Sequence, residues 1–261
     1  VKGSYLSDTS SDTTGYLTAG TLEVKGDVLV NNAYSGGGMV GTENHKLLLS
    51  GEGLQNVDIK GSSETTSRLS NLEITNGSEE GVVLVSELLA TGEVSDHGNH
   101  VSGALCIMNS TVFTDGTYGG DVIIRKELMS LSEDMNIGGS LTIVNWIRLY
   151  GNVTVGSDLN LHKRMEVHGT VYVKKDINQH WGGEICMKNG RLEVEGNYNS
   201  NEGNRNTVVD MRNAKDYIYV HGNVAFHPYS VQMSAGTFEI GGNLTSSRNL
   251  YATGSHRFLF S

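Results

Sequence analysis

A short pattern of residues recurs along the chain and limits the folds that it can form. The pattern is an apolar residue, any residue, glycine, a small polar residue, and then apolar residues at alternate positions. Copies lie over 24–30 (VKGDVLV) and around Gly139, Gly151, Gly169, Gly196, Gly222 and Gly242, with weaker ones near Gly120 and Gly156. Most spacings between copies are close to 18–27 residues. Because alternation of apolar and polar residues indicates β-strands, we expect many short strands separated by glycine turns.

Short strands at this spacing predict a parallel β-solenoid. One coil cannot bury its apolar face alone, whereas coils stacked about 4.8 Å apart bury a continuous core and pair their backbone edges. We therefore expect an all-β fold, a parallel, right-handed β-helix with coils of about 18–27 residues. The glycine would supply a positive φ or a bulge at the corner. The asparagines that follow it are expected to stack as an amide ladder: Asn152, Asn197, Asn223 and Asn243.

An antiparallel sandwich or barrel is the alternative all-β fold. It would join its strands by two-residue turns such as Asn-Gly or Asp-Gly. Such pairs occur at Asn76-Gly77, Asp115-Gly116 and Asn189-Gly190, but most glycines follow the other pattern. The single proline also agrees with a solenoid, because proline cannot donate to a strand ladder.

A longer repeat is superimposed on the short one. The segment 19–27 (AGTLEVKGD) matches 235–243 (AGTFEIGGN), and 43–50 (ENHKLLLS) matches 254–261 (GSHRFLFS). Residues 1–3 also resemble 220–222, so the sequence of 1–50 is repeated by 220–261. Repeat proteins are built in this way from stacked equivalent units. We interpret residues 1–261 as a single β-solenoid segment excised from a longer protein.

Composition excludes several other classes of protein. Hydrophobic residues make up 37% of the chain and charged residues 18%, which is too apolar and too weakly charged for a disordered tail. The 34 glycines follow no G-X-Y period, so the chain is not collagen. A net charge of -10 disfavours nucleic acid as a partner, since phosphate binding needs clustered Lys and Arg. Membrane insertion is not expected either, because no run of 18 apolar residues occurs.

Several phrases of the sequence resemble the repeats of very large surface proteins from anaerobic Firmicutes. They are TAGTLEVKGD, NHKLLLSGEGLQNVDI, LSNLEITN and YIYVHGNVAF. Phrases of this type recur many times in such proteins, often next to immunoglobulin-like modules. The resemblance covers most of the chain and is weakest over 77–118. It implies a secreted, wall-associated β-solenoid at the cell surface, and it implies no catalytic activity.

Few residues are candidates for a functional site. His180 and Trp181 are the binding candidates, because an aromatic ring in a loop flanked by glycine can stack on a sugar or on a partner's side chain. Trp146 is expected to pack against a strand face. The run Asp96-His97-Gly98-Asn99-His100 has metal-ligand types, but one loop supplies all of them, so no metal and no cofactor is predicted.

The two cysteines are expected to be buried core thiols without a disulfide. Cys106 (ALCIMN) and Cys186 (EICMKN) have similar neighbours, which predicts the same place on two different coils. Coils that far apart hold their cysteines beyond the reach of a disulfide. No base adjoins either thiol in the sequence, so no catalytic residue is predicted.

These observations favour a structural or adhesive module of a bacterial surface protein, either a stalk or a scaffold that presents ligands. We expect no enzyme activity, an extracellular location and a monomer in isolation. A host or wall polysaccharide or protein is the expected partner. The alternatives are a polysaccharide lyase or hydrolase on a β-helix, which needs paired carboxylates near a basic residue, and a carbohydrate-binding module without catalysis.

Overall fold

The protein is a parallel β-solenoid. The computed structural model describes residues 1–8, 13–31, 38–108, 111–114, 116–125, 129–200, 207–227, 230–247, 250 and 252–261. Within these residues all regular structure is β-strand, and the strands stack in parallel. The fold class predicted from the sequence is confirmed, and the antiparallel alternative is wrong. The chain divides into two compact units, Val1–Ile123 and Ile124–Ser261.

Unit 1 is built on two main sheets. Sheet 1a consists of β1 (Tyr5–Asp8), β3 (Val28–Asn31), β5 (Gln55–Ile59), β7 (Val82–Leu84) and β10 (Val101–Ser102). Sheet 1b consists of β2 (Thr21–Val24), β4 (Lys46–Leu49), β6 (Asn71–Ile74), β9 (Glu93–Ser95) and β12 (Val112–Phe113). A third ladder pairs β8 (Leu88–Ala90) with β11 (Ala104–Ile107). The strands β13 (Thr117–Tyr118) and β14 (Asp121–Ile124) follow along the chain.

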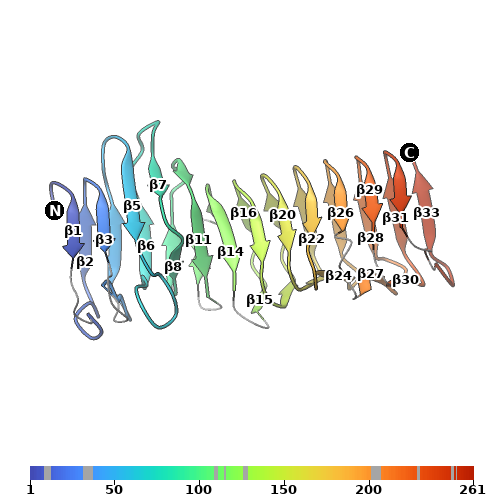
Figure 1. Cartoon of the computed structure of the whole chain (residues 1–261), viewed down its shortest axis with the longest axis horizontal. Helices are drawn as coiled ribbons and strands as arrows, with labels where there is room; N and C mark the ends of the chain where they lie inside the picture. The colour runs from blue at the N-terminus through green and yellow to red at the C-terminus, as the bar shows by residue number, and fades with distance from the viewer. Residues whose placement is uncertain are drawn as a thin grey trace. The chain divides into compact units, whose positions relative to one another are not determined.

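Unit 2 has a three-sided coil, and its strands stack side by side in chain order (Figure 1). Sheet 2a contains β17 (Leu141–Ile143), β20 (Leu159–Leu161), β23 (Ile177–Gln179), β26 (Tyr198–Ser200), β29 (Val224–Phe226) and β32 (Leu244–Ser246). Sheet 2b contains β15 (Met129–Leu131), β18 (Ile147–Leu149), β21 (Arg164–Val167), β24 (Glu184–Met187), β27 (Thr207–Met211) and β30 (Ser230–Met233). Sheet 2c contains β16 (Met135–Ile137), β19 (Val153–Val155), β22 (Thr170–Val173), β25 (Arg191–Val194), β28 (Tyr217–Val220), β31 (Thr237–Ile240) and β33 (Arg257–Phe260).

Alternation along each strand decides which side chains form the core. In β19 the side chains of Val153 and Val155 are buried while Thr154 between them is partly exposed. The partner strand β22 repeats this arrangement in register, so Val171 and Val173 stack on the same two valines. Stacked aliphatic side chains of this kind bury apolar surface worth about 1.5–3 kcal/mol each.

Coil length varies along the chain. Among the described strand pairs, the offset between paired residues ranges from 17 residues, from Leu88 to Leu105, to 29 residues, from Val28 to Val57. The predicted range of 18–27 residues is close to these offsets.

The corner glycines are needed for a different reason from the one predicted. Gly151 and Gly169 are not among the residues with positive φ. A Cβ on Gly169 would lie 2.2 Å from the carbonyl oxygen of Gly151, one coil earlier, and a Cβ on Gly151 would lie 2.2 Å from the carbonyl oxygen of Glu133. These glycines therefore permit a close approach of successive coils rather than an unusual backbone conformation.

A ladder of side chains runs along the corner that precedes sheet 2a. The Asn243 backbone N–H donates to Oδ1 of Asn223 at 2.9 Å, and the Asn223 N–H donates to Oδ1 of Asn197 at 2.9 Å. Asn197 in turn donates to Oδ1 of Asp176 at 2.7 Å. Three of the predicted asparagines thus form one ladder. The prediction is wrong for Asn152, which precedes a strand of sheet 2c and bonds Asp134 there.

The two copies of the longer repeat make the same backbone hydrogen bonds. In the first copy the Gly26 N–H donates to the Gly3 carbonyl at 3.1 Å, and in the second the Gly242 N–H donates to the Gly222 carbonyl at 3.0 Å. The register agrees as well, because β2 aligns Thr21 with Lys46 and β31 aligns Thr237 with Arg257. Matched sequence therefore accompanies matched pairing in the two segments.

Candidate functional site

The predicted binding residues lie at a corner of unit 2, between sheets 2a and 2b. His180 and Trp181 connect β23 to β24, and His162 and Lys163 occupy the same corner one coil earlier. The His162 N–H donates to the Ile143 carbonyl and the His180 N–H to the Leu161 carbonyl, so the sheet ladder continues into the corner. The imidazole rings of His162 and His180 stack with centroids 4.3 Å apart.

Two exposed indoles stand at this corner. Trp181 is 65% exposed, and Trp146, which leads into β18, is 45% exposed. Trp146 was expected to pack against a strand face, and its packing partner is the Arg164 guanidinium, 5.7 Å from the ring centre. Register pairs Arg164 with Glu184, so the two indoles lie on coils two steps apart, about 10 Å along the stack. We call Trp146, His162, Lys163, His180 and Trp181 the aromatic corner.

A buried polar network fixes the loop that carries Trp181. Gln179 is 1% exposed, and its Nε2 donates to the carbonyls of Gly183 and Val208, each at 2.8 Å. The hydroxyl of the fully buried Tyr198 donates to Oε1 of Gln179. The loop closes with a hydrogen bond from the Gly183 N–H to the His180 carbonyl at 2.9 Å. The sequence signal for this network is a glutamine at an inward position of a strand, a place where an apolar residue is the rule.

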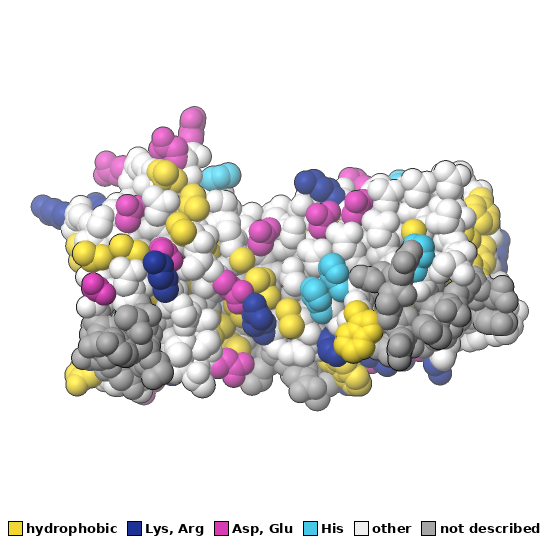
Figure 2. All heavy atoms as spheres, viewed as in Figure 1, with side chains coloured by type: hydrophobic (Ala, Val, Ile, Leu, Met, Phe, Trp, Pro, Cys, Tyr) yellow, Lys and Arg dark blue, Asp and Glu magenta, His cyan; other side chains and the backbone are white. Residues whose placement is uncertain are grey.

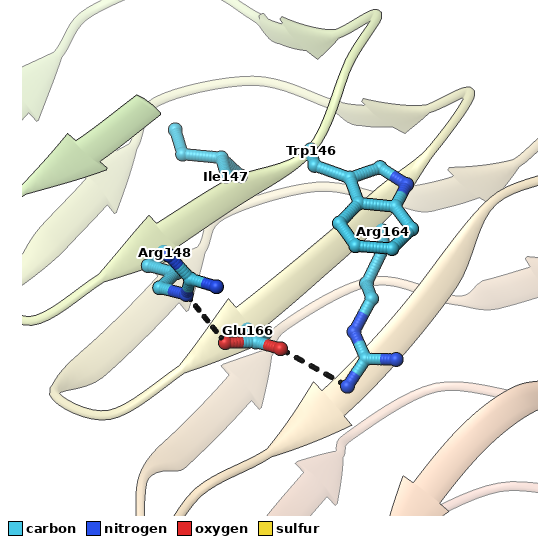
Figure 3. Close-up of a pocket in the computed structure, with 5 residues that line it drawn as sticks. All are labelled: Trp146, Ile147, Arg148, Arg164 and Glu166. Atoms are coloured by element: carbon cyan, nitrogen blue, oxygen red, sulfur yellow. Dashed lines mark hydrogen bonds and ion pairs between the residues drawn. The ribbon is translucent and has the colours of Figure 1, made fainter. Parts of the chain in front are cut away.

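Next to the aromatic corner, the outer face of sheet 2b carries a row of charged and polar side chains. Register places these residues opposite one another on successive strands: Arg148, Glu166, Cys186, Asp210 and Gln232. Arg148 Nε lies 3.0 Å from Glu166 Oε2, and Arg164 Nη2 lies 3.0 Å from Glu166 Oε1. The two arginines reach Glu166 from opposite sides (Figure 3).

The carboxylates of this face are balanced by arginines. Arg164 also lies 3.6 Å from Glu184, and Arg212 Nε lies 2.7 Å from Asp210 Oδ1. Three carboxylates, those of Glu166, Glu184 and Asp210, thus face three guanidinium groups, those of Arg148, Arg164 and Arg212. No short sequence motif indicates this cluster, because its members are one coil apart in the chain.

Two of these carboxyl groups have different proton affinities. Burial raises the pKa of Glu184, and the opposing charge of Arg164 does not cancel this effect. Burial also acts on Glu166, but the hydrogen bond from Arg148 and the charge of Arg164 together hold its pKa below its ordinary value. Pairs of carboxyl groups with unequal pKa values occur in enzymes that use acid–base catalysis.

The pocket at this face is too small for a sugar ring. Trp146, Ile147, Arg148, Arg164 and Glu166 line it (Figure 3). Its volume is about 10 Å³, the space of about one water molecule. A ligand at the aromatic corner would therefore lie on the surface.

Cys186 belongs to this outer face, which corrects the prediction for the cysteines. Both Cys106 and Cys186 are buried and neither forms a disulfide, as predicted. They do not occupy the same place, because Cys106 lies on β11 and Cys186 on β24 of sheet 2b. Cys186 is fully buried, as predicted, but its contacts are partly polar, since its Sγ accepts a hydrogen bond from Arg164 at 3.1 Å and lies 3.7 Å from Asp210. Burial raises the pKa of its thiol, which makes it a poor nucleophile.

The run Asp96–His100 is a structural turn of unit 1. Asp96 is completely buried, and its carboxylate accepts hydrogen bonds from the N–H groups of Gly98 and Gly119 at 3.0 and 2.7 Å. It is therefore not oriented toward a metal. Among the residues that the structure describes, no group of three or more His, Cys, Asp or Glu is placed to hold a metal ion.

Comparison with models of known families, with curated proteins and with solved structures found no match to this chain. In the described part of the chain, no helix is long and apolar enough to cross a membrane. The geometry defines a class of architecture, the parallel β-solenoid, with an exposed aromatic corner on unit 2.

Proposed function

We propose that this chain is an adhesive structural module, a β-solenoid that binds polysaccharide at the aromatic corner without chemical change. The observation that carries the proposal is the exposure of Trp146 and Trp181, 45% and 65%, on one corner. Large aromatic side chains are costly to leave in water, and their faces stack on the C–H surfaces of sugar rings. Two rings about 10 Å apart along the stack would contact one extended chain at two places.

The state of the neighbouring charges supports a neutral ligand. Each carboxylate on the outer face of sheet 2b has an arginine partner, so this face offers little net charge to a polyanion or a polycation. On the face seen in Figure 2, several acidic side chains gather at the upper left and the others are spread among neutral ones. Stacking and hydroxyl hydrogen bonds would then supply most of the affinity.

Binding of the whole chain to a panel of soluble and insoluble polysaccharides tests the proposal. We expect Trp181→Ala and Trp146→Ala each to weaken binding by about threefold to tenfold, the cost of about one aromatic contact. The double variant should abolish binding. Tyr16→Ala is the matched control, because Tyr16 is an aromatic residue 81% exposed in unit 1. The proposal would be overturned if the chain binds no polysaccharide of the panel, or if the double variant still binds.

We also propose an extracellular place for the module, at the surface of a bacterial cell. The support is the resemblance of its repeated phrases to Firmicute surface repeats and the match between 1–50 and 220–261. Antibody raised against this chain should label intact cells of the source organism. Labelling that requires permeabilised cells would contradict this location.

A polysaccharide-active enzyme is the second candidate, and one observation favours it. Glu184 and Glu166 flank Arg164, and burial raises the pKa of Glu184 while Arg148 and Arg164 hold that of Glu166 low. A proton donor and a charged carboxylate are the pair that glycoside hydrolysis uses. If this candidate is right, the chain depolymerises a polysaccharide and Glu184→Gln stops it. A chain that binds but releases no reducing ends supports the module instead.

A further inference from the structure

Unit 1 contains a second, larger cavity on the outer face of sheet 1b. Its volume is about 140 Å³, and Lys46, Asn71, Glu73, Glu93, Ser95 and His97 contribute to its lining. This space is several water molecules in size and smaller than the ~300–1,000 Å³ of sites for drug-sized ligands. A single small ligand therefore fits it better than an extended chain. None of these residues belongs to the aromatic corner.

The strand register places the polar lining on one face. Lys46 on β4 is directly opposite Asn71 on β6, and Glu73 on β6 is opposite Ser95 on β9. Residues two apart on a strand point to the same side, so Asn71 and Glu73 share the outer face. The apolar residues between them, such as Leu72, face the core.

His97 is directed to this cavity by the turn described above. Its φ is +51°, a left-handed conformation that costs free energy for a residue with a Cβ. The buried Asp96 stabilises the turn by binding the N–H groups of Gly98 and Gly119. As a result, His97 Nε2 lies 3.2 Å from Glu73 Oε1. A strained residue held by a buried carboxylate indicates a position where the side chain matters.

The cavity has an excess of negative charge. Lys46 Nζ lies 2.7 Å from Glu73 Oε2, so the one ammonium group of the lining is already paired. The hydrogen bonds from Lys46 and His97 hold the pKa of Glu73 below its ordinary value. Glu93 is exposed and takes part in none of the ion pairs among the described residues. Its carboxylate is available to a cation that enters the cavity.

We propose that this cavity binds one amino sugar residue, with the sugar ammonium group at Glu93. An ammonium group forms a charge-assisted hydrogen bond with a carboxylate, which is stronger than a bond between neutral groups. Thr114 lines the same space, and its hydroxyl, which donates to the Val94 carbonyl at 3.4 Å, can accept a hydrogen bond from a hydroxyl group of the sugar. The proposal does not depend on polysaccharide binding at the aromatic corner.

Calorimetric titration of the whole chain tests this site with defined ligands. Glucosamine should bind, whereas glucose, which lacks the amine, and N-acetylglucosamine, whose amine is acylated, should bind at least about tenfold more weakly. Binding of glucosamine should weaken as salt is added, because the pairing at Glu93 is near the surface. Ethanolamine carries an amine but no sugar ring, so it tests whether the ring contributes to binding. It should bind more weakly than glucosamine.

Variants assign the binding to the cavity. Glu93→Gln should weaken glucosamine binding by about tenfold, whereas Glu79→Gln, at another exposed glutamate of unit 1, should leave it unchanged. His97→Asn keeps a residue that tolerates a positive φ but removes the imidazole that bonds Glu73 in the cavity wall, so it should also weaken binding. Equal binding of glucose and glucosamine, undiminished binding by Glu93→Gln, or no saturable binding would overturn the proposal. Ethanolamine binding as tight as that of glucosamine would overturn the assignment to a sugar.

Discussion

The imidazole rings of His162 and His180 stack almost parallel, with an angle of 8° between their planes and 4.3 Å between their centres. Each ring belongs to a different coil, so the pair joins two successive corners at the site of the exposed indoles. Burial lowers the pKa of His162, and the nearby His180 lowers it further. Protonation of His162 is therefore less favourable in the folded chain than in the unfolded chain.

We predict that this pair makes the protein less stable in mild acid. Because the pKa of His162 is lowered on folding, the unfolded chain takes up the proton first as the pH falls below about 6.5, and the free energy of unfolding decreases. The contribution is fully present above that pH and is lost through the lowered pKa of the folded state. In His162→Gln the decrease between neutral and mildly acid pH should be smaller, as urea unfolding at several pH values would measure.

His100→Gln is the control for this prediction, because it removes an exposed histidine. Burial also lowers the pKa of His45 and of His256, so some acid sensitivity should remain in every variant. Identical pH profiles for the wild type and His162→Gln would contradict the prediction.

The asparagine ladder predicts an order of stability for substitutions at Asn223. Asn223→Ala removes the oxygen that accepts from the backbone and side chain of Asn243, at 2.9 and 3.3 Å. The expected cost is about 0.5–1.5 kcal/mol of unfolding free energy. Asn223→Asp keeps the acceptor, as Asp176 does in the same ladder, and should cost less. Chemical denaturation would measure the order, and an alanine variant as stable as the wild type would refute it.

The polar network beneath Trp181 gives a third prediction. Tyr198→Phe removes the hydroxyl that donates to the buried Gln179 and leaves the amide oxygen unsatisfied, at a cost of about 1–3 kcal/mol. The measurement is the midpoint of thermal or urea unfolding. Tyr219→Phe is the matched control, since Tyr219 is only partly buried on sheet 2c, and should change the midpoint little. Similar midpoints for the two variants would show that the network does not stabilise the corner.

Close stacking at the glycines gives a fourth prediction. Gly169→Ala brings a methyl group within 2.2 Å of the Gly151 carbonyl oxygen and should destabilise the protein by about 1–3 kcal/mol. Gly53→Ala should be tolerated, because its Cβ would lie 3.6 Å from the nearest atom, in the side chain of Glu80. Circular dichroism melts of the two variants would compare them. If Gly169→Ala has the same melting temperature as Gly53→Ala, the close approach of the coils is not the reason for these glycines.

Local pattern was sufficient to predict the fold, because each coil repeats the same signal. Alternation around Val153 and Val155 indicates a strand, and the glycine before them indicates a corner. The same alternation, applied to β24, would have placed Cys186 outside, between the inward residues Ile185 and Met187. The apolar neighbours of Cys186 correctly indicate burial, but only its phase in the strand indicates that polar residues of sheet 2b contact it.

The site could be predicted only in part, because contacts across coils depend on coil length. Trp181 was identified from its glycine neighbours alone. The pairing of Arg148 with Glu166 spans 18 residues and that of Cys186 with Asp210 spans 24 residues, so no fixed spacing reveals both. Register is set by loops of variable length, and an error of one residue moves a side chain to the other face.

The ladder through Asn197, Asn223 and Asn243 has a consequence for how such a protein changes over generations. Asn197 and Asn223 each accept from the coil that follows and donate to the coil before, so each of their coils presents the same connector on both sides. Deletion or duplication of a whole coil would leave matching connectors at the junction. A gene that encodes this fold can therefore change the length of its product in steps of one coil while the cross-section is preserved.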